Sequence, residues 1–324
     1  MTDPGEILIR NAEVAGRPGQ DVRLSGGRIQ VIGEGLASAA ETIDARGGAL
    51  IAGLIDHHIH LLATAARADS LSLSDVGNAD GLALRLREGL AARPPGAWLR
   101  AVGYNDGAAG LLGRDDLDRL APDHPVRVQD RTGALWILNS RALQLIWKGD
   151  LPPSVELDPA GRPTGRIWRG DAWLQSRIGR VAPPLAPIGA ILASRGVTGA
   201  MDASATNDAD SALLLAEAVR AGDLPLNLHL MSAGPLEPPP DGAYEVGPLK
   251  ILLDDRDLPS VEDLVARIAV ARATRRAVAV HCVTAAELAV TLAAFDAAGA
   301  LPGDRVEHGG MIPAHAIGPQ ASVL

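Results

Sequence analysis

The sequence predicts an α/β protein built as a (β/α)8 barrel of the TIM type that is incomplete, with about six barrel strands. The prediction rests on a repeated unit in which an apolar strand candidate is followed by a helical stretch, except after the last strand. These candidates end near Asp202, His229, Lys250, His281 and His308, at intervals of 27, 21, 31 and 27 residues. A strand, a helix and two short loops need about that many residues, and repeating them gives a parallel sheet wrapped by helices. The first of the six strands in chain order precedes His58.

The chain opens with a small β-sheet domain, which we expect over residues 1–48. Residues 7–31 have the alternation of short strands, and Gly26 and Gly27 suit a tight hairpin turn between two of them. The apolar run 49–55 then predicts a strand buried on both faces, which we take as the first barrel strand.

A partial barrel domain is expected over residues 49–324, with an insertion at about 62–188. All five tryptophans lie in this insertion, between Trp98 and Trp173, and it is rich in proline and glycine. We interpret it as an insertion over the mouth of the barrel, because loops at that face usually shape the pocket. A separate flanking domain without contact to the site is the alternative.

The later helices carry their own signals. Apolar residues recur on one helix face in 261–268, and Thr284 with Glu287 has the spacing of a capping box. A closed barrel has eight strands, but only 16 residues follow His308, where two further units would need roughly 50. Residues 310–324 predict neither a strand nor a long helix. We therefore expect an open barrel that stops early.

Composition excludes several classes of protein. Hydrophobic residues make up 47% and charged residues 21%, as in globular proteins, and 30 basic against 39 acidic residues provide no electrostatic footprint for nucleic acid. The single cysteine, Cys282, excludes a disulfide framework and fits a reducing compartment. Residues 1–11 lack a secretory leader and no apolar run reaches about 18 residues, so we expect a cytoplasmic protein with no membrane partner. The motifs of serine hydrolases, P-loop hydrolases and dinucleotide enzymes are absent from the sequence.

Histidines gather where the predicted strands end. His58 and His60 are two residues apart, so both side chains leave one face and can share a metal ion; a pair of surface histidines is the alternative. His281 and His308 end the fifth and sixth strands, and the carboxyl ends of barrel strands meet at one rim. Either of these two alone would fit an ordinary core histidine. The four together indicate a metal centre.

Lys250 stands within the apolar run 249–253 of the fourth strand. Burial of a bare ammonium is costly, so this lysine must be paired, deprotonated or chemically altered. A neutral amine can take up carbon dioxide to give a carbamate, whose anionic oxygens can bridge two metal ions. A lysine that reaches solvent or pairs with Asp254 or Asp255 is the alternative, and the local sequence favours neither.

Other histidines and one aspartate are weaker candidates. His229 ends the third strand candidate, where a supporting hydrogen bond is at least as well favoured as ligation. Asp202 either orients a ligand or caps the following turn, with the cap favoured. We interpret His57, His124 and His315 as incidental.

These residues, with several separated segments, resemble the amidohydrolase superfamily of metal-dependent hydrolases, in its branch of N-substituted formamide deformylases. The resemblance runs from Ile7 to about Pro313. Its parts are the N-terminal hairpin, the H-x-H of His58 and His60, and the segments 98–104, 123–126, 139–143, 163–165, 196–198, 249–250 and 305–308.

The resemblance implies hydrolysis of a carbon–nitrogen bond other than a peptide bond, in a small-molecule amide, formamide or cyclic amide. His58, His60, His281, His308 and a carboxylated Lys250 would hold one or two divalent ions, usually zinc. The ions would lower the pKa of bound water toward about 7 and polarise the substrate carbonyl, so that hydroxide attacks and an amine leaves.

The resemblance also implies an aspartate at the end of an eighth strand, and no catalytic residue of this sequence is expected to fill that role. The alternative function is a truncated, catalytically incomplete remnant that only binds metal; a nonmetal binding protein on a barrel scaffold is a third. Unpaired strand edges and an open barrel predict poor solubility, a partner chain or a truncated gene product, and a homo-oligomer is one expectation.

Overall fold

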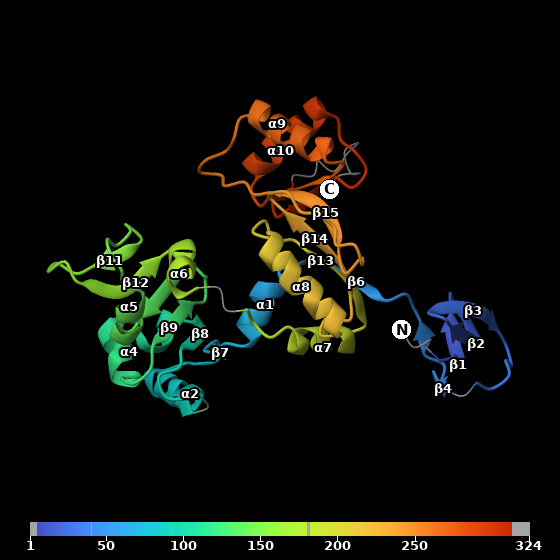
Figure 1. Ribbon diagram of the computed structural model, residues 1–324, viewed down its shortest axis with the longest axis horizontal. Helices are drawn as coiled ribbons and strands as arrows, with labels where there is room; N and C mark the ends of the chain where they lie inside the picture. The colour runs from blue at the N-terminus through green and yellow to red at the C-terminus, as the bar shows by residue number, and fades with distance from the viewer. Residues whose placement is uncertain (1–4, 40, 92, 180–181, 313–324) are drawn as a thin grey trace. The chain divides into compact units, whose positions relative to one another are not determined.

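The structure is a computed structural model that describes residues 5–39, 41–91, 93–179 and 182–312 (Figure 1). The chain divides into two compact units. The first comprises Met1–Ile55 with Gly196–Gly199, and the second comprises Asp56–Arg195 with Ala200–Leu324. None of the helices in the described part of the chain is long and apolar enough to cross a membrane. The predicted lack of regular structure in 310–324 falls mostly on residues 313–324, which lie outside the described residues.

The first unit contains a sheet with the strand order β3-β2-β1-β4, in which β5 also pairs with β1. Its strands are β1 (Ile7–Val14), β2 (Arg17–Ser25), β3 (Arg28–Gly33), β4 (Glu41–Asp44) and β5 (Ala49–Leu50). Gly26 and Gly27 both adopt positive φ and join β2 to β3 in a tight turn. Leu8, Ala12 and Val22 are fully buried on this sheet.

The apolar run 49–55 is not the strand buried on both faces that the sequence predicted. Strand β5 takes up only its first two residues, and β6 (Leu54–Ile59) begins near its end. Leu54 and Ile55 are 50% and 55% exposed. The physical reason is that burial of both faces of a strand requires layers packed on each side of the sheet, and an apolar run does not encode whether those layers are present.

A parallel half-barrel sheet of six strands is the architecture that carries the site. Its order, β17-β16-β15-β14-β13-β6, follows the chain strand by strand. The strands after β6 are β13 (Val197–Asp202), β14 (Asn227–Ser232), β15 (Glu245–Ile251), β16 (Val278–Cys282) and β17 (Arg305–His308). Strands β14 to β17 pair in parallel. The predicted set of six barrel strands is therefore confirmed.

Helices follow four of these strands. They are α1 (Leu61–Ala68), α8 (Ala209–Ala221), α9 (Val261–Ala273) and α10 (Ala285–Ala298). The prediction of a helix after every strand but the last is wrong for β14, which reaches β15 through residues 233–244 without a described helix. Three consecutive prolines, 238–240, explain the difference, because proline removes a backbone donor and breaks a helix interior.

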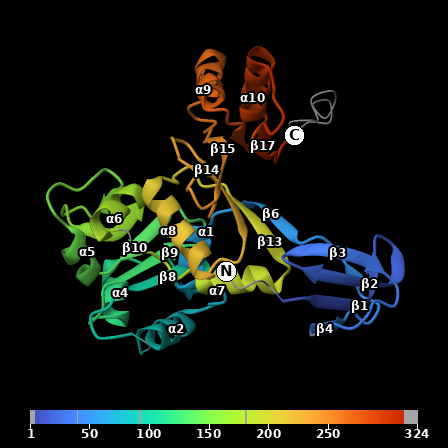
Figure 2. The ribbon, with the colours of Figure 1, turned by 45° about the vertical axis from the view of Figure 1, so that its right-hand side comes forward.

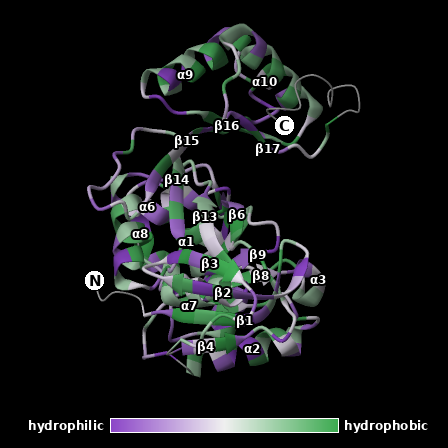
Figure 3. Cartoon of the chain, turned by 90° about the vertical axis from the view of Figure 1, so that its right-hand side faces the viewer, coloured by the Kyte–Doolittle hydropathy of each residue, from purple (hydrophilic) through white to green (hydrophobic). Residues whose placement is uncertain are grey.

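Helices α9 and α10 lie side by side and pack on one face of β15 and β16 (Figure 2). Helix α9 carries both hydrophobic and hydrophilic residues (Figure 3), and its Leu264 and Ile268 are buried as the sequence predicted. The predicted capping box is confirmed, since Thr284 and Glu287 bond each other's backbone at the start of α10. Alternate residues of β15 and β16 are left for the other face of the sheet.

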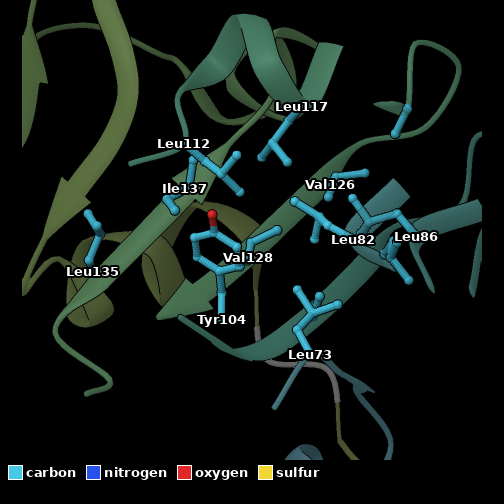
Figure 4. Packing of buried hydrophobic residues seen from close by; sticks show 13 residues of the cluster. Leu73, Leu82, Leu86, Tyr104, Leu112, Leu117, Val126, Val128, Leu135 and Ile137 are labelled. Atoms are coloured by element: carbon cyan, nitrogen blue, oxygen red, sulfur yellow. The ribbon is translucent and has the colours of Figure 1, made fainter. Parts of the chain in front are cut away.

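The stretch between α1 and β13 forms a sheet of its own, with the order β11-β12-β10-β9-β8-β7. Its strands are β7 (Leu71–Ser72), β8 (Leu99–Tyr104), β9 (Val126–Asp130), β10 (Leu135–Leu138), β11 (Val155–Leu157) and β12 (Pro163–Trp168). The helices of this stretch are α2 (Ala79–Ala91), α3 (Asp106–Ala109), α4 (Arg114–Leu120), α5 (Ser140–Ile146), α6 (Asp171–Ile178) and α7 (Ala186–Ser194). Tyr104, Leu117 and Val128 belong to the apolar core on one of its faces (Figure 4). The place of this stretch over the barrel mouth stays a prediction.

Candidate metal centre

The structure brings the four predicted histidines together at the carboxyl ends of three strands. The ring of His58 lies 5.2 Å from that of His60 and 4.6 Å from that of His308, measured between centroids. His281 lies 4.6 Å from His308 by the same measure. Because β6 and β17 are the two ends of the six-stranded sheet, contact between His58 and His308 requires that the sheet curl as a barrel does.

The rings are neighbours without being a finished ligand set. Among the described residues, no three histidine, cysteine, aspartate or glutamate side chains form a ready-made group for a metal ion. The ring planes of His58 and His60 are at 88°, and those of His281 and His308 at 73°. Because no three of these side chains already form a group for a metal ion, zinc–nitrogen bonds of about 2.0–2.1 Å would require the side chains to move toward a common point.

Lys250 faces the same side of the sheet as two other charged or polar residues of the site. In the parallel register Lys250 pairs with Ala279, and two residues further on His281 pairs with Glu307. Alternate residues of neighbouring strands share a face, so Lys250, His281 and Glu307 lie on one surface.

The side chain of Lys250 is 1% exposed, and its Nζ has no hydrogen-bond partner among the described residues. The alternative in which it reaches solvent or pairs with Asp254 or Asp255 is therefore wrong, and Asp254 instead binds Arg256. Burial lowers the pKa of Lys250, although the nearby Glu307 acts to raise it. A buried amine with no partner fits a lysine that is neutral or chemically altered.

Desolvation lowers the pKa of His60, His281 and His308. A charged Lys250 would act in the same direction on all three rings, while Asp202 opposes this effect at His60. Neutral imidazole is the form that binds a metal ion. The electrostatics of the site thus favour the state that ligation needs.

Glu307 is a site residue that the sequence analysis missed. Its carboxylate, 3% exposed, contacts Nδ1 of His58 through Oε2, and Arg305 Nε lies 2.7 Å from its Oε1. Burial acts to raise its pKa, but the His58 hydrogen bond with the charges of Lys250 and Arg305 holds the pKa of Glu307 below its usual value. Alternation along the last strand, where Glu307 is two residues from Arg305, is the signal that could have placed it inward.

His308 has an uncommon backbone conformation. Its φ is +69°, in the left-handed region that residues other than glycine rarely adopt, and Gly309 continues at φ +56°. Backbone strain of this kind is found at functional sites that the surrounding structure supports. The turn changes the direction of the His308 ring at the end of β17, where it meets both His58 and His281.

Asp202 acts as the cap that the sequence favoured. It is fully buried, and its carboxylate accepts hydrogen bonds from the Ser204 backbone N–H at 3.0 Å and from the Asn207 side chain at 3.0 Å. It also accepts from the Leu61 N–H at 2.7 Å, at the start of α1. Ser204, which the sequence analysis did not single out, lies 2.9 Å through its Oγ from Nδ1 of His60. No pattern in the sequence marks a serine in this turn.

His229 and His124 make contacts of their own outside this cluster. The sequence analysis predicted that His229 ends its strand, but β14 continues to Ser232. His229 pairs with Glu245 at the start of β15, with 3.5 Å between Nδ1 and Oε2. His124 Nδ1 lies 3.0 Å from the backbone oxygen of Ala97. His315 lies outside the described residues.

Comparison with known proteins agrees with this architecture. The N-substituted formamide deformylase of Arthrobacter pascens is 28% identical over 267 residues, which cover 72% of this chain and 48% of the deformylase. The chain thus spans about half the length of this curated relative. The structure of an uncharacterized metal-dependent hydrolase from Pyrococcus horikoshii OT3 matches the chain with a TM-score of 0.75 at 18% identity. The match covers 96% of this chain and 72% of that protein. A second one from Pyrococcus furiosus matches with a TM-score of 0.73 at 19% identity, over 96% of this chain and 74% of its own.

The two solved structures share the fold of the chain. The sequence comparison is more specific, since a model of the amidohydrolase family matches residues 41–324, which is most of the chain. This match confirms the resemblance that the separated segments indicated. The chain belongs to the amidohydrolase family.

Proposed function

We propose that this chain is a metal-dependent hydrolase that cleaves a carbon–nitrogen bond other than a peptide bond. The substrate is a small-molecule amide, formamide or cyclic amide. The observation that supports this proposal is the meeting of four imidazoles at the carboxyl ends of parallel strands in a chain of the amidohydrolase family. The deformylase relative supports the formamide as one substrate class to test.

His58, His60, His281 and His308, with Lys250, would hold one or two divalent ions, and zinc suits the imidazole donors. A bound divalent ion of this kind acidifies water and polarises a carbonyl. The chain's own residues fit the ion because burial lowers the pKa of three of the imidazoles, which favours their neutral form, and because the Lys250 amine has no hydrogen-bond partner among the described residues.

We further propose that Lys250 is carboxylated when metal binds. The neutral amine nitrogen attacks the carbon of carbon dioxide, a C–N bond forms, and one proton leaves to solvent. The product is a carbamate anion, which replaces an amine that the described residues leave unpaired. An anionic oxygen donor at this place would balance the positive charge of the ion.

A second candidate function is that of a protein that binds metal without turnover. It accounts for the meeting of the four imidazoles without requiring any residue of the chain to turn over a substrate. For either function, the single buried cysteine supports a place in a reducing cytoplasm. The acidic composition supports the absence of nucleic acid as a partner.

Metal analysis combined with an amidase assay tests the proposal. The purified chain is analysed for bound metal, and hydrolysis of N-substituted formamides, linear amides and cyclic amides is measured before chelation, after chelation, and after zinc is restored. We expect bound zinc and activity that chelation abolishes. Bound zinc without turnover favours the second candidate. A chain that binds no metal, and in which His58→Ala and His281→Ala change nothing, contradicts both.

A further inference from the structure

We propose that Glu307 and Ser204 are positioning residues for the histidine pair of the candidate metal centre. Each holds Nδ1 of one imidazole, Glu307 that of His58 and Ser204 that of His60, so that Nε2 of both rings is left for the metal ion. The role of the ion rests on the proposed function, whereas the two contacts are properties of the chain itself.

The donor and the acceptor of the hydrogen bond between His58 and Glu307 are defined. An ionised carboxylate accepts hydrogen bonds and donates none, so Nδ1 of His58 carries the proton, and in the neutral ring this leaves the lone pair on Nε2. Glu307 is held in place in turn by Arg305, whose Nε lies 2.7 Å from Oε1. Arg305 also donates through Nη2 to the backbone oxygen of His57 at 2.8 Å. Two residues of β17 therefore hold both the ring of His58 and the backbone beside it.

The contact of His60 comes from a different part of the sheet. Ser204 lies in the turn after β13, and its Oγ is 2.9 Å from Nδ1 of His60. The buried carboxylate of Asp202 fixes both partners, because it accepts from the N–H of Ser204 at 3.0 Å and from the N–H of Leu61, next to His60, at 2.7 Å. The hydroxyl oxygen can then accept the Nδ1 proton of His60.

The two rings have their contacts on the same nitrogen. Among the described residues none makes a hydrogen bond to Nε2 of His58 or of His60. Which nitrogen of a histidine ring carries the proton is set by the hydrogen bonds that the ring makes, so an acceptor at Nδ1 favours the form that ligates through Nε2. Residues that hold a ligand's second nitrogen in this way fix its tautomer and orientation, and their loss typically costs about 10–100-fold in metal affinity.

The first measurement uses metal-free wild-type protein with 15N-labelled histidine. Long-range 1H–15N spectra at a pH where the rings are neutral report which nitrogen carries the proton, and His58→Gln and His60→Gln assign the signals. We expect the Nδ1–H tautomer for both rings. Nε2–H signals from both rings would overturn the proposal without the use of any other variant.

The second measurement uses variants that remove one acceptor. We expect Glu307→Met, which keeps the side-chain volume, to move His58 alone to the Nε2–H tautomer, and Ser204→Ala to move His60 alone. Glu307→Gln retains an acceptor oxygen, so His58 should keep the Nδ1–H tautomer of the wild type in this variant. The matched controls are Glu245→Gln, which alters the exposed carboxylate beside His229, and the exposed Ser194→Ala. Neither control should change either tautomer.

Zinc affinity, measured by competition with a chromophoric chelator, gives the second readout. We expect it to fall about 10–100-fold in Glu307→Met and in Ser204→Ala, with a smaller loss in Glu307→Gln. Wild-type protein that binds zinc but shows unchanged tautomers in both variants overturns this inference and leaves the proposed function standing. Wild-type protein with the expected tautomers that binds no zinc supports the two contacts and contradicts the proposed function.

Discussion

Arg305, on the last strand of the half-barrel sheet, donates a 2.8 Å hydrogen bond to the backbone oxygen of His57 on the first. These two strands share no backbone ladder, because they stand at opposite ends of the sheet. Arg305 also contacts Glu307 and the sulfur of Met201 on β13. One guanidinium thus connects three strands across the concave side of the sheet.

Replacement of Arg305 by Met should destabilise the half barrel, because it leaves the buried Glu307 carboxylate without its cation and the His57 oxygen without a donor. The expected loss in the free energy of unfolding is about 1–3 kcal/mol, measured by urea denaturation. Arg256→Met is the matched control, since Arg256 is an exposed residue that pairs with Asp254. Equal losses in the two variants would contradict a connecting role for Arg305.

Replacement of Lys250 by Met should have opposite effects on stability and on metal binding. Methionine fills the buried site without an amine to desolvate, so the metal-free protein should gain about 1–3 kcal/mol in the free energy of unfolding. Zinc retention after dialysis should fall, because a candidate ligand is lost. The exposed Lys148→Met serves as control for both readings. A large loss of stability in Lys250→Met would show that the lysine is paired after all.

Much of the fold was predictable because its signals are local. Apolar runs that end in a polar or basic residue marked the six strands, and the spacing of Thr284 and Glu287 marked the start of α10. The same reasoning failed for 49–55, since an apolar run does not show whether neighbouring strands cover it. It also failed after β14, where strand spacing suggested a helix that the prolines at 238–240 do not allow.

The candidate site also contains residues that local signals could predict and residues that they could not. The four histidines were predictable because each stands near the end of a strand, and the ends of parallel strands meet. Glu307 and Ser204 were not, because their roles depend on contacts over 249 and 144 residues of sequence. The contact of Glu307 with His58 exists only because the two end strands of the sheet approach each other. Alternation along β17 can place Glu307 inward, but no period or motif within either strand shows which residue it contacts.

The stability of the half barrel should fall in acid through Asp304. Its buried carboxylate accepts from Arg272 and from the N–H groups of Val278 and Leu301. Burial acts to raise its pKa, but these hydrogen bonds together with the charge of Arg272 hold the pKa of Asp304 below its ordinary value of 3.8. A depressed pKa means that the contribution is fully present above 3.8 and is lost as the pH falls below it toward the folded-state pKa.

Asp304→Asn tests this dependence. At neutral pH we expect the variant to lose about 1–3 kcal/mol in the free energy of unfolding, because a buried charged hydrogen-bond network is broken. Below pH 4 the difference between wild type and variant should narrow. Urea denaturation at several pH values between 7 and 3 measures both effects, with the exposed Asp255→Asn as control. A difference that stays constant across this range would exclude Asp304 as the titrating group.

The start of α10 should be sensitive to the loss of its cap. The Thr284 hydroxyl accepts the N–H of Glu287 at 3.2 Å, and the Glu287 carboxylate accepts the N–H of Thr284 at 2.9 Å. Thr284→Ala removes the first bond and should cost about 0.5–2 kcal/mol in the free energy of unfolding. Thr284→Ser keeps the hydroxyl and should recover most of that loss. Because α10 packs on β16, a loss that serine does not recover would point to packing of the threonine methyl in place of capping.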